Sequence, residues 1–314
     1  MKSKIVITEF MTGSKLDDLK KQGEVIYDPD LWRKDELTTE VKDAHVVIVR
    51  NQTEVDASLI NNAQNLKIIG RLGVGLDNID LKAARSRDIS VIYARNANAI
   101  SVAEYVLGTM FQFSRKYHNA TLEIKKGLWD RKKYALNELY GKKLGLIGVG
   151  EISARLAMRA KALGMEILGY DPFVPPYEIA IMDHGVQLCT LNEVVSQSDF
   201  ISIHVPLNKY TKNMINKDML SLMKSKCYVI NTSRGGVINE EALYDALSSG
   251  IIAGAALDVY AKEPPLNSPI LALDNVILTP HIAGVTQEAQ FRTSAIIVDE
   301  VIKVLQGKQS LCVA

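Results

Sequence analysis

Short apolar segments alternate with amphipathic segments along almost the whole chain, and this alternation constrains the fold more than any other feature. The segments between the apolar runs, such as "SKLDDLKKQG" and "VDASLINNAQN", carry apolar residues at helical spacing. Strands that are apolar on both faces and separated by helices are typical of a parallel sheet covered on both sides. In the first third of the chain, strands are predicted at residues 5–8, 25–27, 46–49, 67–69 and 90–93.

The same alternation starts again after a long segment of helical period, residues 101–126. The second series of strands is predicted at residues 143–149, 167–170, 200–204, 228–231, 255–259 and 276–278. A last helix with apolar residues at helical spacing ends at Gly307. Two consecutive series of this kind predict an α/β protein with two doubly wound parallel-sheet domains.

Composition narrows the class of partner. The 314 residues have room for two domains, and 37 Lys and Arg against 36 Asp and Glu leave a net charge of +1. Such a balance gives no reason to expect nucleic acid or an anionic membrane as a partner. Cys189, Cys227 and Cys312 are far apart and odd in number, so we expect no metal site and no disulfide framework. The apolar runs beside Cys189 and Cys227 predict buried, reduced thiols. With no leader or membrane-spanning run, a soluble, cytoplasmic protein is expected.

A glycine turn stands at the start of the second series, in "LGLIGVGEISARLA". Gly148 permits a tight turn between strand and helix, and Gly150 permits close approach of a pyrophosphate. The phosphates would meet the N–H groups that begin the helix, at Glu151 and Ile152. Ser153 replaces the usual third glycine, and we expect it to loosen the helix–strand packing.

An acidic residue follows at the distance that ribose binding requires. Asp171, in "GYDP", lies 23 residues after Gly148 (171 − 148 = 23), close to the roughly 20 typical of dinucleotide sites. A carboxylate there would accept hydrogen bonds from ribose hydroxyls and repel a 2′-phosphate, which favours NAD over NADP. The alternative is a glycine-rich turn that binds no dinucleotide.

Three further residues follow predicted strands of the second series, where ligands bind in open α/β folds. They are Arg234 in "NTSRGG", Glu263 in "LDVYAKEPP" and His281 in "LTPHIAG". Arginine can hold a carboxylate and polarise a carbonyl, histidine can donate a proton, and glutamate can orient the histidine. These roles suit reduction of a 2-keto acid. Taken singly, Arg234 also suits a surface ion pair and Glu263 an ordinary loop.

Long motifs in a fixed order resemble one known family, the D-isomer-specific 2-hydroxyacid dehydrogenases. The matching stretches are "GRLGVGLDNID", "NANAISVAEY", "LGLIGVGEISARLA", "GYDP", "HVPLNKYT", "NTSRGGVINEEAL", "AGAALDVYAKEPP" and "TPHIAG". The resemblance implies a discontinuous, flavodoxin-like substrate domain, residues 1–99 and 287–314, and a Rossmann NAD-binding domain, residues 100–286. It also implies a homodimer through the NAD-binding domain, with "KKGLWDRKKYALNELYGKK" similar to a dimerisation arm.

The resemblance assigns residues to the cofactor and to catalysis. Arg234, Glu263 and His281 match the catalytic set, and Asp258 matches a contact to the nicotinamide amide. The other expected NAD contacts are Gly148, Gly150, Glu151, Ile152, Asp171, His204, Pro206, Thr211, Thr232, Ser233 and Gly284.

For the substrate, the resemblance points to the backbone of Val74 and Gly75 and to the side chain of Asn98. Asn98 lies in the stretch "NANA", where the family more usually has Asn-Gly-Asn. Arg234 and His281 are expected to contact the substrate too. Within the family the chain is most similar to phosphoglycerate dehydrogenases, whose phosphate-binding arginine matches Arg50 in "VVIVRNQTEVDASLI". The expected reaction interconverts 3-phosphoglycerate and 3-phosphohydroxypyruvate, as in serine biosynthesis, without a regulatory C-terminal domain.

Other functions remain open from the sequence. Arg50 would also suit a sulfonate, as in a sulfolactate dehydrogenase. If Arg50 merely ends a strand, the chain would be a hydroxypyruvate or glyoxylate reductase. A non-enzyme alternative is an NAD(H)-sensing binding protein similar to the transcriptional corepressors that share this fold. Turnover of NADH with keto acids separates the last alternative from the enzymes.

Overall fold

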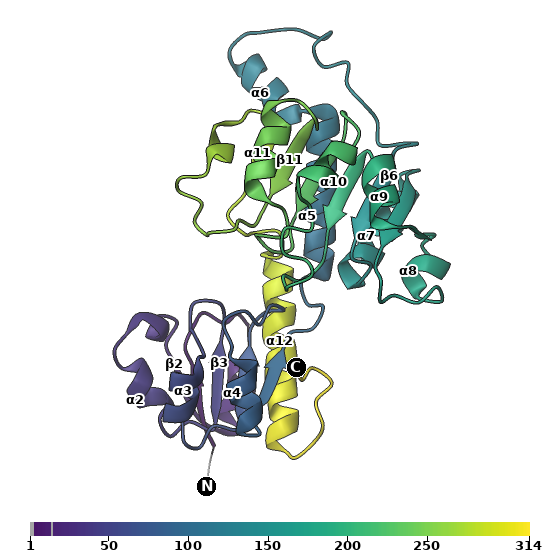
Figure 1. Ribbon diagram of the computed structural model, residues 1–314. Helices are drawn as coiled ribbons and strands as arrows, with labels where there is room; N and C mark the ends of the chain where they lie inside the picture. Colours follow the sequence, from purple (N-terminus) through teal and green to yellow (C-terminus); the bar gives the residue numbers. More distant parts are fainter. Residues whose placement is uncertain (1–2, 14) are drawn as a thin grey trace. The chain divides into compact units, whose positions relative to one another are not determined.

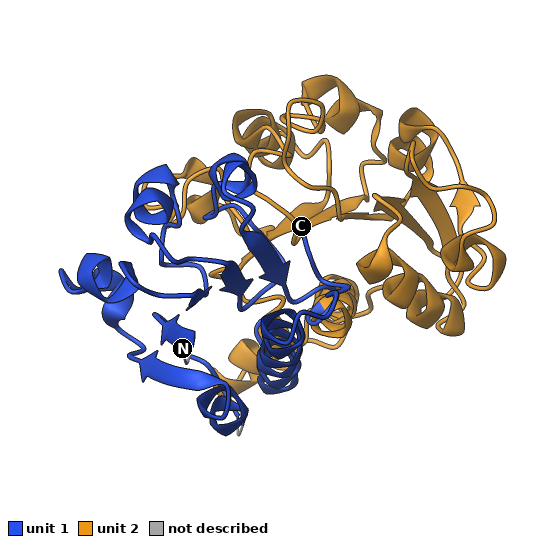
Figure 2. Cartoon of the chain, turned by 90° about the horizontal axis from the view of Figure 1, so that it is seen from below, with its two compact units in different colours: residues 1–98, 285–314 blue, residues 99–284 orange. Residues whose placement is uncertain are grey.

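Two parallel sheets form the framework of the computed structural model, which describes residues 3–13 and 15–314 (Figure 1). The chain divides into two compact units, coloured separately in Figure 2: Met1–Asn98 with Val285–Ala314, and Ala99–Gly284. We call them unit 1 and unit 2 and describe each by itself. The substrate-binding role expected for unit 1 stays a prediction.

Unit 1 has a five-stranded sheet in the order β2-β1-β3-β4-β5, with every pair parallel. This is the flavodoxin-like order 2-1-3-4-5. Its strands are β1 (Ser3–Ile7), β2 (Gly23–Tyr27), β3 (Val46–Val49), β4 (Ile68–Arg71) and β5 (Ser90–Tyr93). One face packs on α2 (Leu37–Val41), α3 (Ala57–Asn62) and α4 (Leu81–Ser86), and the other on α1 (Leu16–Lys20) and α12 (Gln287–Leu305). A short 3-10 turn spans Leu31–Arg33.

Unit 2 has a seven-stranded parallel sheet in the order β12-β11-β10-β9-β6-β7-β8. Its strands are β6 (Lys143–Ile147), β7 (Glu166–Tyr170), β8 (Gln187–Leu188), β9 (Phe200–Ile203), β10 (Tyr228–Asn231), β11 (Gly254–Leu257) and β12 (Val276–Leu278). The direction of winding reverses between β6 and β9, and ligands bind at such a point in open α/β sheets.

Helices cover both faces of this sheet, and each face has its own apolar core. One core packs α5 (Ala99–Arg115), α7 (Glu151–Ala162) and α8 (Ile179–Met182) against the sheet. The other packs α9 (Leu191–Gln197), α10 (Lys217–Leu222) and α11 (Glu240–Ser248). A 3-10 turn, Pro269–Ala272, precedes β12. Two doubly wound α/β sheets are therefore confirmed.

Two local predictions were wrong, and one short strand was missed. The expected long helix is two helices, α5 and α6 (Tyr117–Lys125), because Lys116 between them has a left-handed backbone with φ 49°. The apolar stripe of α5 is buried as far as Phe113, whereas α6 has no buried residue, so nothing extends the first helix. Cys189 is partly exposed, although Cys227 is buried as expected. Strand β8 has two residues and was not predicted.

Candidate active site

The glycine turn joins β6 to α7 and leaves room for a phosphate group. Gly148 has φ +89°, and a Cβ there would lie 2.8 Å from the carbonyl oxygen of His204, so only glycine fits. A Cβ on Gly150 would meet nothing within 4 Å. Gly150 is the N-cap of α7 and no side chain caps this helix, so the N–H groups of Glu151 and Ile152 face that open space. These residues fit a dinucleotide pyrophosphate.

Ser153 is buried next to the glycine turn and bonded to it. Its side chain is fully buried, and its hydroxyl donates to the carbonyl oxygen of Gly148 at 2.5 Å. The helix is thereby bonded to the turn that precedes it. Serine is small enough to be buried here and brings its own hydrogen-bond donor, and the expectation of looser packing than with glycine stays a prediction.

Asp171 lies at the carboxyl end of β7 and is bonded to the glycine turn. One carboxylate oxygen accepts from the N–H of Val149 at 2.9 Å, and the other accepts from the N–H of Phe173 at 2.9 Å. A carboxylate oxygen can accept more than one hydrogen bond, so ribose hydroxyls can still bind. The structure thus places Asp171 beside the turn, as ribose binding requires.

Two buried polar atoms near the same sheet edge have no hydrogen-bond partner among the described residues. They are Oγ1 of Thr232 and Nδ1 of His204. The Nε2 of His204 bonds Ser202 at 2.8 Å, and burial lowers the pKa of His204 to about 4, so its ring is neutral near pH 7. Buried polar atoms are nearly always paired, so these two fit a site that a polar ligand completes.

The loop after His204 is held by Thr211. The hydroxyl of Thr211 donates to the carbonyl oxygen of Pro206 at 2.5 Å and accepts from the N–H of Asn208 at 2.9 Å. Thr211 is buried and Pro206 is exposed. In the structure Thr211 therefore shapes the loop, and its expected contact with the cofactor stays a prediction.

Arg234 follows β10 on a loop that Asn231 holds. The side-chain oxygen of Asn231 accepts from the N–H and hydroxyl of Ser233, and its amide donates to the carbonyl oxygen of Arg234 at 2.9 Å. Next along the chain, a Cβ on Gly235 would lie 1.8 Å from the carbonyl oxygen of Tyr260, so the loops after β10 and β11 touch. The guanidinium donates to the carbonyl oxygen of Ser233 at 2.7 Å.

His281 and Glu263 form a direct pair. Nδ1 of His281 lies 2.9 Å from Oε2 of Glu263, and the N–H of Tyr260 donates to Oε1 of the same carboxylate at 3.1 Å. The side chains of His281 and Glu263 are 52% and 41% exposed, so a substrate can reach the ring. A carboxylate on Nδ1 fixes the tautomer and leaves Nε2 toward the reacting group. The structure thus brings together the loops of all three predicted catalytic residues.

Asp258 is bonded to the His281 loop. Its carboxylate is 1% exposed and accepts from the hydroxyl of Thr279 at 2.6 Å. It also accepts from the N–H groups of Ile282 at 2.7 Å and Ala283 at 2.8 Å. Asp258 therefore has a structural role, and its expected contact with the nicotinamide amide stays a prediction, as does that of Gly284.

Unit 1 places Arg50 at the carboxyl end of β3, on a loop built around a buried carboxylate. Oε1 of Glu9 accepts from the N–H groups of Arg50 and Thr53 at 2.7 and 3.0 Å, and Oε2 accepts from those of Asn51 and Gln52 at 3.1 and 2.9 Å. The hydroxyl of Thr53 also donates to Oε1. Within residues 3–13 and 15–314, the Arg50 side chain makes no hydrogen bond or ion pair with another side chain.

The other predicted substrate residues follow the neighbouring strands. Val74 and Gly75 lie on the loop after β4, and Asn98 lies beyond the end of β5. The N–H of Ala94 donates to the carbonyl oxygen of Gly73 at 2.9 Å, so the two loops touch. Strands β3, β4 and β5 are adjacent and parallel. Arg50, Val74, Gly75 and Asn98 therefore lie along one edge of this sheet.

Comparison with known proteins decides the family. Residues 107–283 match the model of the D-isomer specific 2-hydroxyacid dehydrogenase NAD binding domain, which is more than half of the chain. The chain belongs to the D-isomer-specific 2-hydroxyacid dehydrogenase family. NAD, the cofactor expected from the sequence, is confirmed by this match.

Relatives at about 40% identity carry two different names. The chain is 44% identical to a D-3-phosphoglycerate dehydrogenase of Methanocaldococcus jannaschii over 97% of its own length and 58% of that protein. It is 42% identical to a hydroxypyruvate reductase of Thermotoga maritima over 87% of its length and 88% of that protein. The chain thus spans little more than half the length of the curated phosphoglycerate dehydrogenases it matches.

A solved structure of a third family member supports the cofactor and the fold. The D-lactate dehydrogenase of Aquifex aeolicus, complexed with NAD and lactic acid, is 29% identical, with a TM-score of 0.84. The match covers 97% of this chain and 96% of that one.

Three residues that shape the two sheet edges were not predicted: Glu9, Thr279 and Tyr105. Glu9 follows a buried strand as an acidic residue in an apolar context, which was the only signal for it. Thr279 and Tyr105 gave none, because their partners lie far away in the sequence.

Residues 3–13 and 15–314 contain no group of three or more His, Cys, Asp or Glu placed to hold a metal ion. Over the same residues, no helix has both the length and the apolar character needed to cross a membrane.

Proposed function

We propose that this dehydrogenase reduces a 2-keto acid with a second acidic group to the D-2-hydroxy acid, with 3-phosphohydroxypyruvate as the best candidate. The Glu263–His281 pair beside the Arg234 loop supports the reaction type. The Arg50 side chain, unpaired among the described residues and at the carboxyl edge of unit 1, supports the second anion. A planar guanidinium suits phosphate as well as sulfonate.

The residues have distinct tasks in this mechanism. The Gly148 turn and Asp171 would hold NADH, whose chemistry when bound would be the supply of a hydride to C2 of the keto acid. Arg234 binds the substrate carboxylate and polarises the carbonyl. Nε2 of His281 donates a proton to the carbonyl oxygen as the alcohol forms. Glu263, bonded to Nδ1 at 2.9 Å, holds the ring in position and stabilises the imidazolium before the proton leaves.

The test is the initial rate of NADH oxidation with a panel of keto acids: 3-phosphohydroxypyruvate, sulfopyruvate, hydroxypyruvate, glyoxylate and pyruvate. We expect the highest kcat/KM for one of the two doubly acidic substrates. In Arg50→Ala, that preference should fall by about 10- to 100-fold, with little change for glyoxylate. Arg33→Ala, an exposed arginine of the same unit, is the matched control.

Hydroxypyruvate reduction is the second candidate, because the Thermotoga maritima relative aligns over 88% of its length. Preference for hydroxypyruvate or glyoxylate, unaffected by Arg50→Ala, would establish it and make Arg50 structural. NADH binding without oxidation by any keto acid would instead favour an NAD(H)-sensing protein. A cytoplasmic location and a role in serine biosynthesis stay predictions.

We further propose that two copies pair through α6 and the segment that follows it, residues 126–140. Figure 1 shows both extending beyond one end of the unit 2 sheet. Exposed apolar side chains gather there, including Ile124 at 54%, Trp129 at 79% and Tyr140 at 75%. Clustered exposed apolar residues are typical of protein–protein interfaces.

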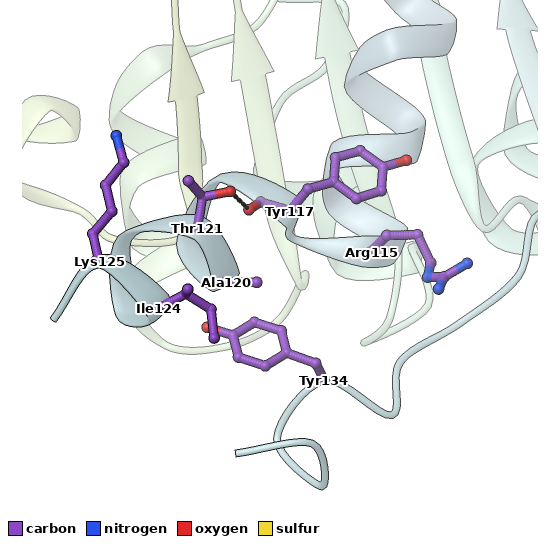
Figure 3. Close-up of a pocket in the computed structure, with 7 residues that line it drawn as sticks. All are labelled: Arg115, Tyr117, Ala120, Thr121, Ile124, Lys125 and Tyr134. Atoms are coloured by element: carbon purple, nitrogen blue, oxygen red, sulfur yellow. Dashed lines mark hydrogen bonds between the residues drawn. The ribbon is translucent and has the colours of Figure 1, made fainter. Parts of the chain in front are cut away.

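This surface also contains a pocket, which side chains of a second copy could fill (Figure 3). Tyr134 of the following segment and Ile124 of α6 both line it. Arg115 and Lys125 contribute charged side chains to the lining. An apolar surface with charged side chains at its edge is the usual composition of such contacts.

A further inference from the structure

The backbone of His281 is held in an unfavourable conformation. Its φ is 56°, in the left-handed region that residues with a Cβ rarely adopt. Such a conformation costs free energy and persists only when surrounding contacts fix it. The contacts of the loop from Thr279 to Ala283 therefore control where the imidazole lies.

One buried carboxylate bonds this loop on both sides of His281. Before it, the hydroxyl of Thr279 donates to Oδ1 of Asp258 at 2.6 Å. After it, the N–H groups of Ile282 and Ala283 donate to Oδ1 and Oδ2 at 2.7 and 2.8 Å. Hydrogen bonds to a buried carboxylate are among the strongest in proteins. Asp258 thus fixes the two ends of the strained segment.

The chain of hydrogen bonds continues to Tyr105 on α5, and its direction follows from the chemistry. The hydroxyl of Tyr105 lies 2.6 Å from that of Thr279. The Thr279 hydroxyl has one hydrogen and donates it in the bond to Asp258. In its bond with Tyr105 the Thr279 oxygen is therefore the acceptor, and the Tyr105 hydroxyl is the donor. Burial raises the pKa of Tyr105 and keeps that proton in place. Each bond in such a chain polarises and strengthens the next.

A second tyrosine fixes the same loop by its backbone. The hydroxyl of Tyr260 lies 3.1 Å from the carbonyl oxygens of both Leu257 and Thr279. Tyr260 therefore bonds the end of β11 to the end of β12. Its hydroxyl bonds the backbone of Thr279, whereas that of Tyr105 bonds the Thr279 hydroxyl, so the two tyrosines can be separated by substitution.

We propose that Tyr105 is a positioning residue for His281, acting through the hydroxyl of Thr279 and the carboxylate of Asp258. The proposal rests on the proposed role of His281 as proton donor. Tyr105 takes no part in the chemistry. It bonds the His281 loop to α5, a 17-residue helix packed into the unit 2 core. Without that bond the imidazole samples more orientations, and fewer of them are productive.

The first variant is Tyr105→Phe, which keeps the ring and removes the hydroxyl. We expect kcat for NADH oxidation to fall about 3- to 10-fold, the loss that one neutral hydrogen bond represents. The dissociation constant for NADH, measured by fluorescence titration, should not change. Tyr228→Phe is the matched control, because Tyr228 is a half-buried tyrosine at the opposite, amino end of β10. Equal losses in both variants would overturn the proposal.

A double-mutant cycle tests the route through Thr279. Thr279→Val removes the hydroxyl, and adding Tyr105→Phe to it should cause no further loss of kcat, since the connection is already broken. Thr279→Ser keeps the hydroxyl and should retain most activity. Losses of kcat that multiply in the double variant would show that Tyr105 acts independently and overturn the proposal.

His281→Ala separates this inference from the proposed function. If His281→Ala is inactive while the kcat of Tyr105→Phe equals that of the unmodified enzyme, the positioning role of Tyr105 is refuted and the role of His281 stands. If His281→Ala keeps full turnover, His281 is not the proton donor, and the positioning role proposed for Tyr105 is refuted with it. A fall of kcat in Tyr105→Phe, with inactive His281→Ala and unchanged NADH binding, supports both.

Discussion

At the scale of single residues, carboxylates that follow β-strands organise both sheet edges. Glu9 follows β1, Asp171 follows β7 and Asp258 follows β11. Each accepts hydrogen bonds from at least two backbone N–H groups, at least one of which belongs to another loop. A carboxylate offers several acceptor positions and no donor, so it suits N–H groups that loops leave unpaired.

Asp171 is predicted to set the preference for NADH over NADPH. In Asp171→Asn the side chain can still accept from the N–H of Val149, but it no longer carries the charge that repels a 2′-phosphate. We expect the ratio of kcat/KM for NADH to that for NADPH to fall by at least about 10-fold. Asp183→Asn, exposed at the end of α8, is the control. An unaltered ratio would count against the ribose role.

His204 is predicted to make stability depend on pH. Burial lowers its pKa from 6.5 to about 4, so the unfolded chain binds more protons than the folded one between those values. Stability is therefore lost as the pH falls through this window, by up to about 3 kcal/mol. Urea unfolding at pH 7.5 and pH 5 should show a smaller difference for His204→Asn than for the unmodified protein. His118→Asn, exposed on α6, should change nothing; equal pH dependence in all three would refute the prediction.

At the scale of elements, the loops after parallel strands carry the site, and the strands determine where these loops meet. Arg234, Glu263 and His281 follow β10, β11 and β12, which are adjacent in the sheet. Their common edge was predictable because parallel strands end on the same side. The Gly148 turn was predictable too, since its residues are local in sequence.

Connections between distant residues were not predictable from the sequence. Tyr105 and Thr279 are 174 residues apart, and Glu9 lies 41 residues before Arg50. No local pattern marks such pairs, because tertiary packing alone brings them together. The break at Lys116 had no glycine or proline to indicate it, and it shows where packing, rather than helix propensity, ends α5.

The loop after β3 is predicted to depend on the charge of Glu9. In Glu9→Gln, the amide NH₂ must face N–H donors in either orientation, because both carboxylate oxygens accept from the backbone. We expect the free energy of unfolding in urea to fall by about 2–3 kcal/mol. Glu24→Gln, exposed on β2, is the control. Equal stability of the two variants would contradict this account.

At the scale of the whole molecule, the prediction concerns the dimer. Ile124→Asp puts a charge into the exposed apolar surface of α6 and should convert a dimer to a monomer, because an unpaired charge is costly in an interface. Sedimentation velocity measures the change. Met182→Asp, on an exposed apolar residue of α8, should leave the dimer intact. A monomeric unmodified protein, or a dimer unaffected by Ile124→Asp, would refute the proposed pairing.

In the proposed reaction His281, held by Glu263, donates the proton during reduction of a keto acid. The most direct measurement is NADH oxidation by His281→Ala with the best keto acid, beside a titration of NADH binding. We expect kcat to be lower by about 100- to 10,000-fold, with nearly unchanged NADH affinity. Turnover equal to that of the unmodified enzyme would contradict it.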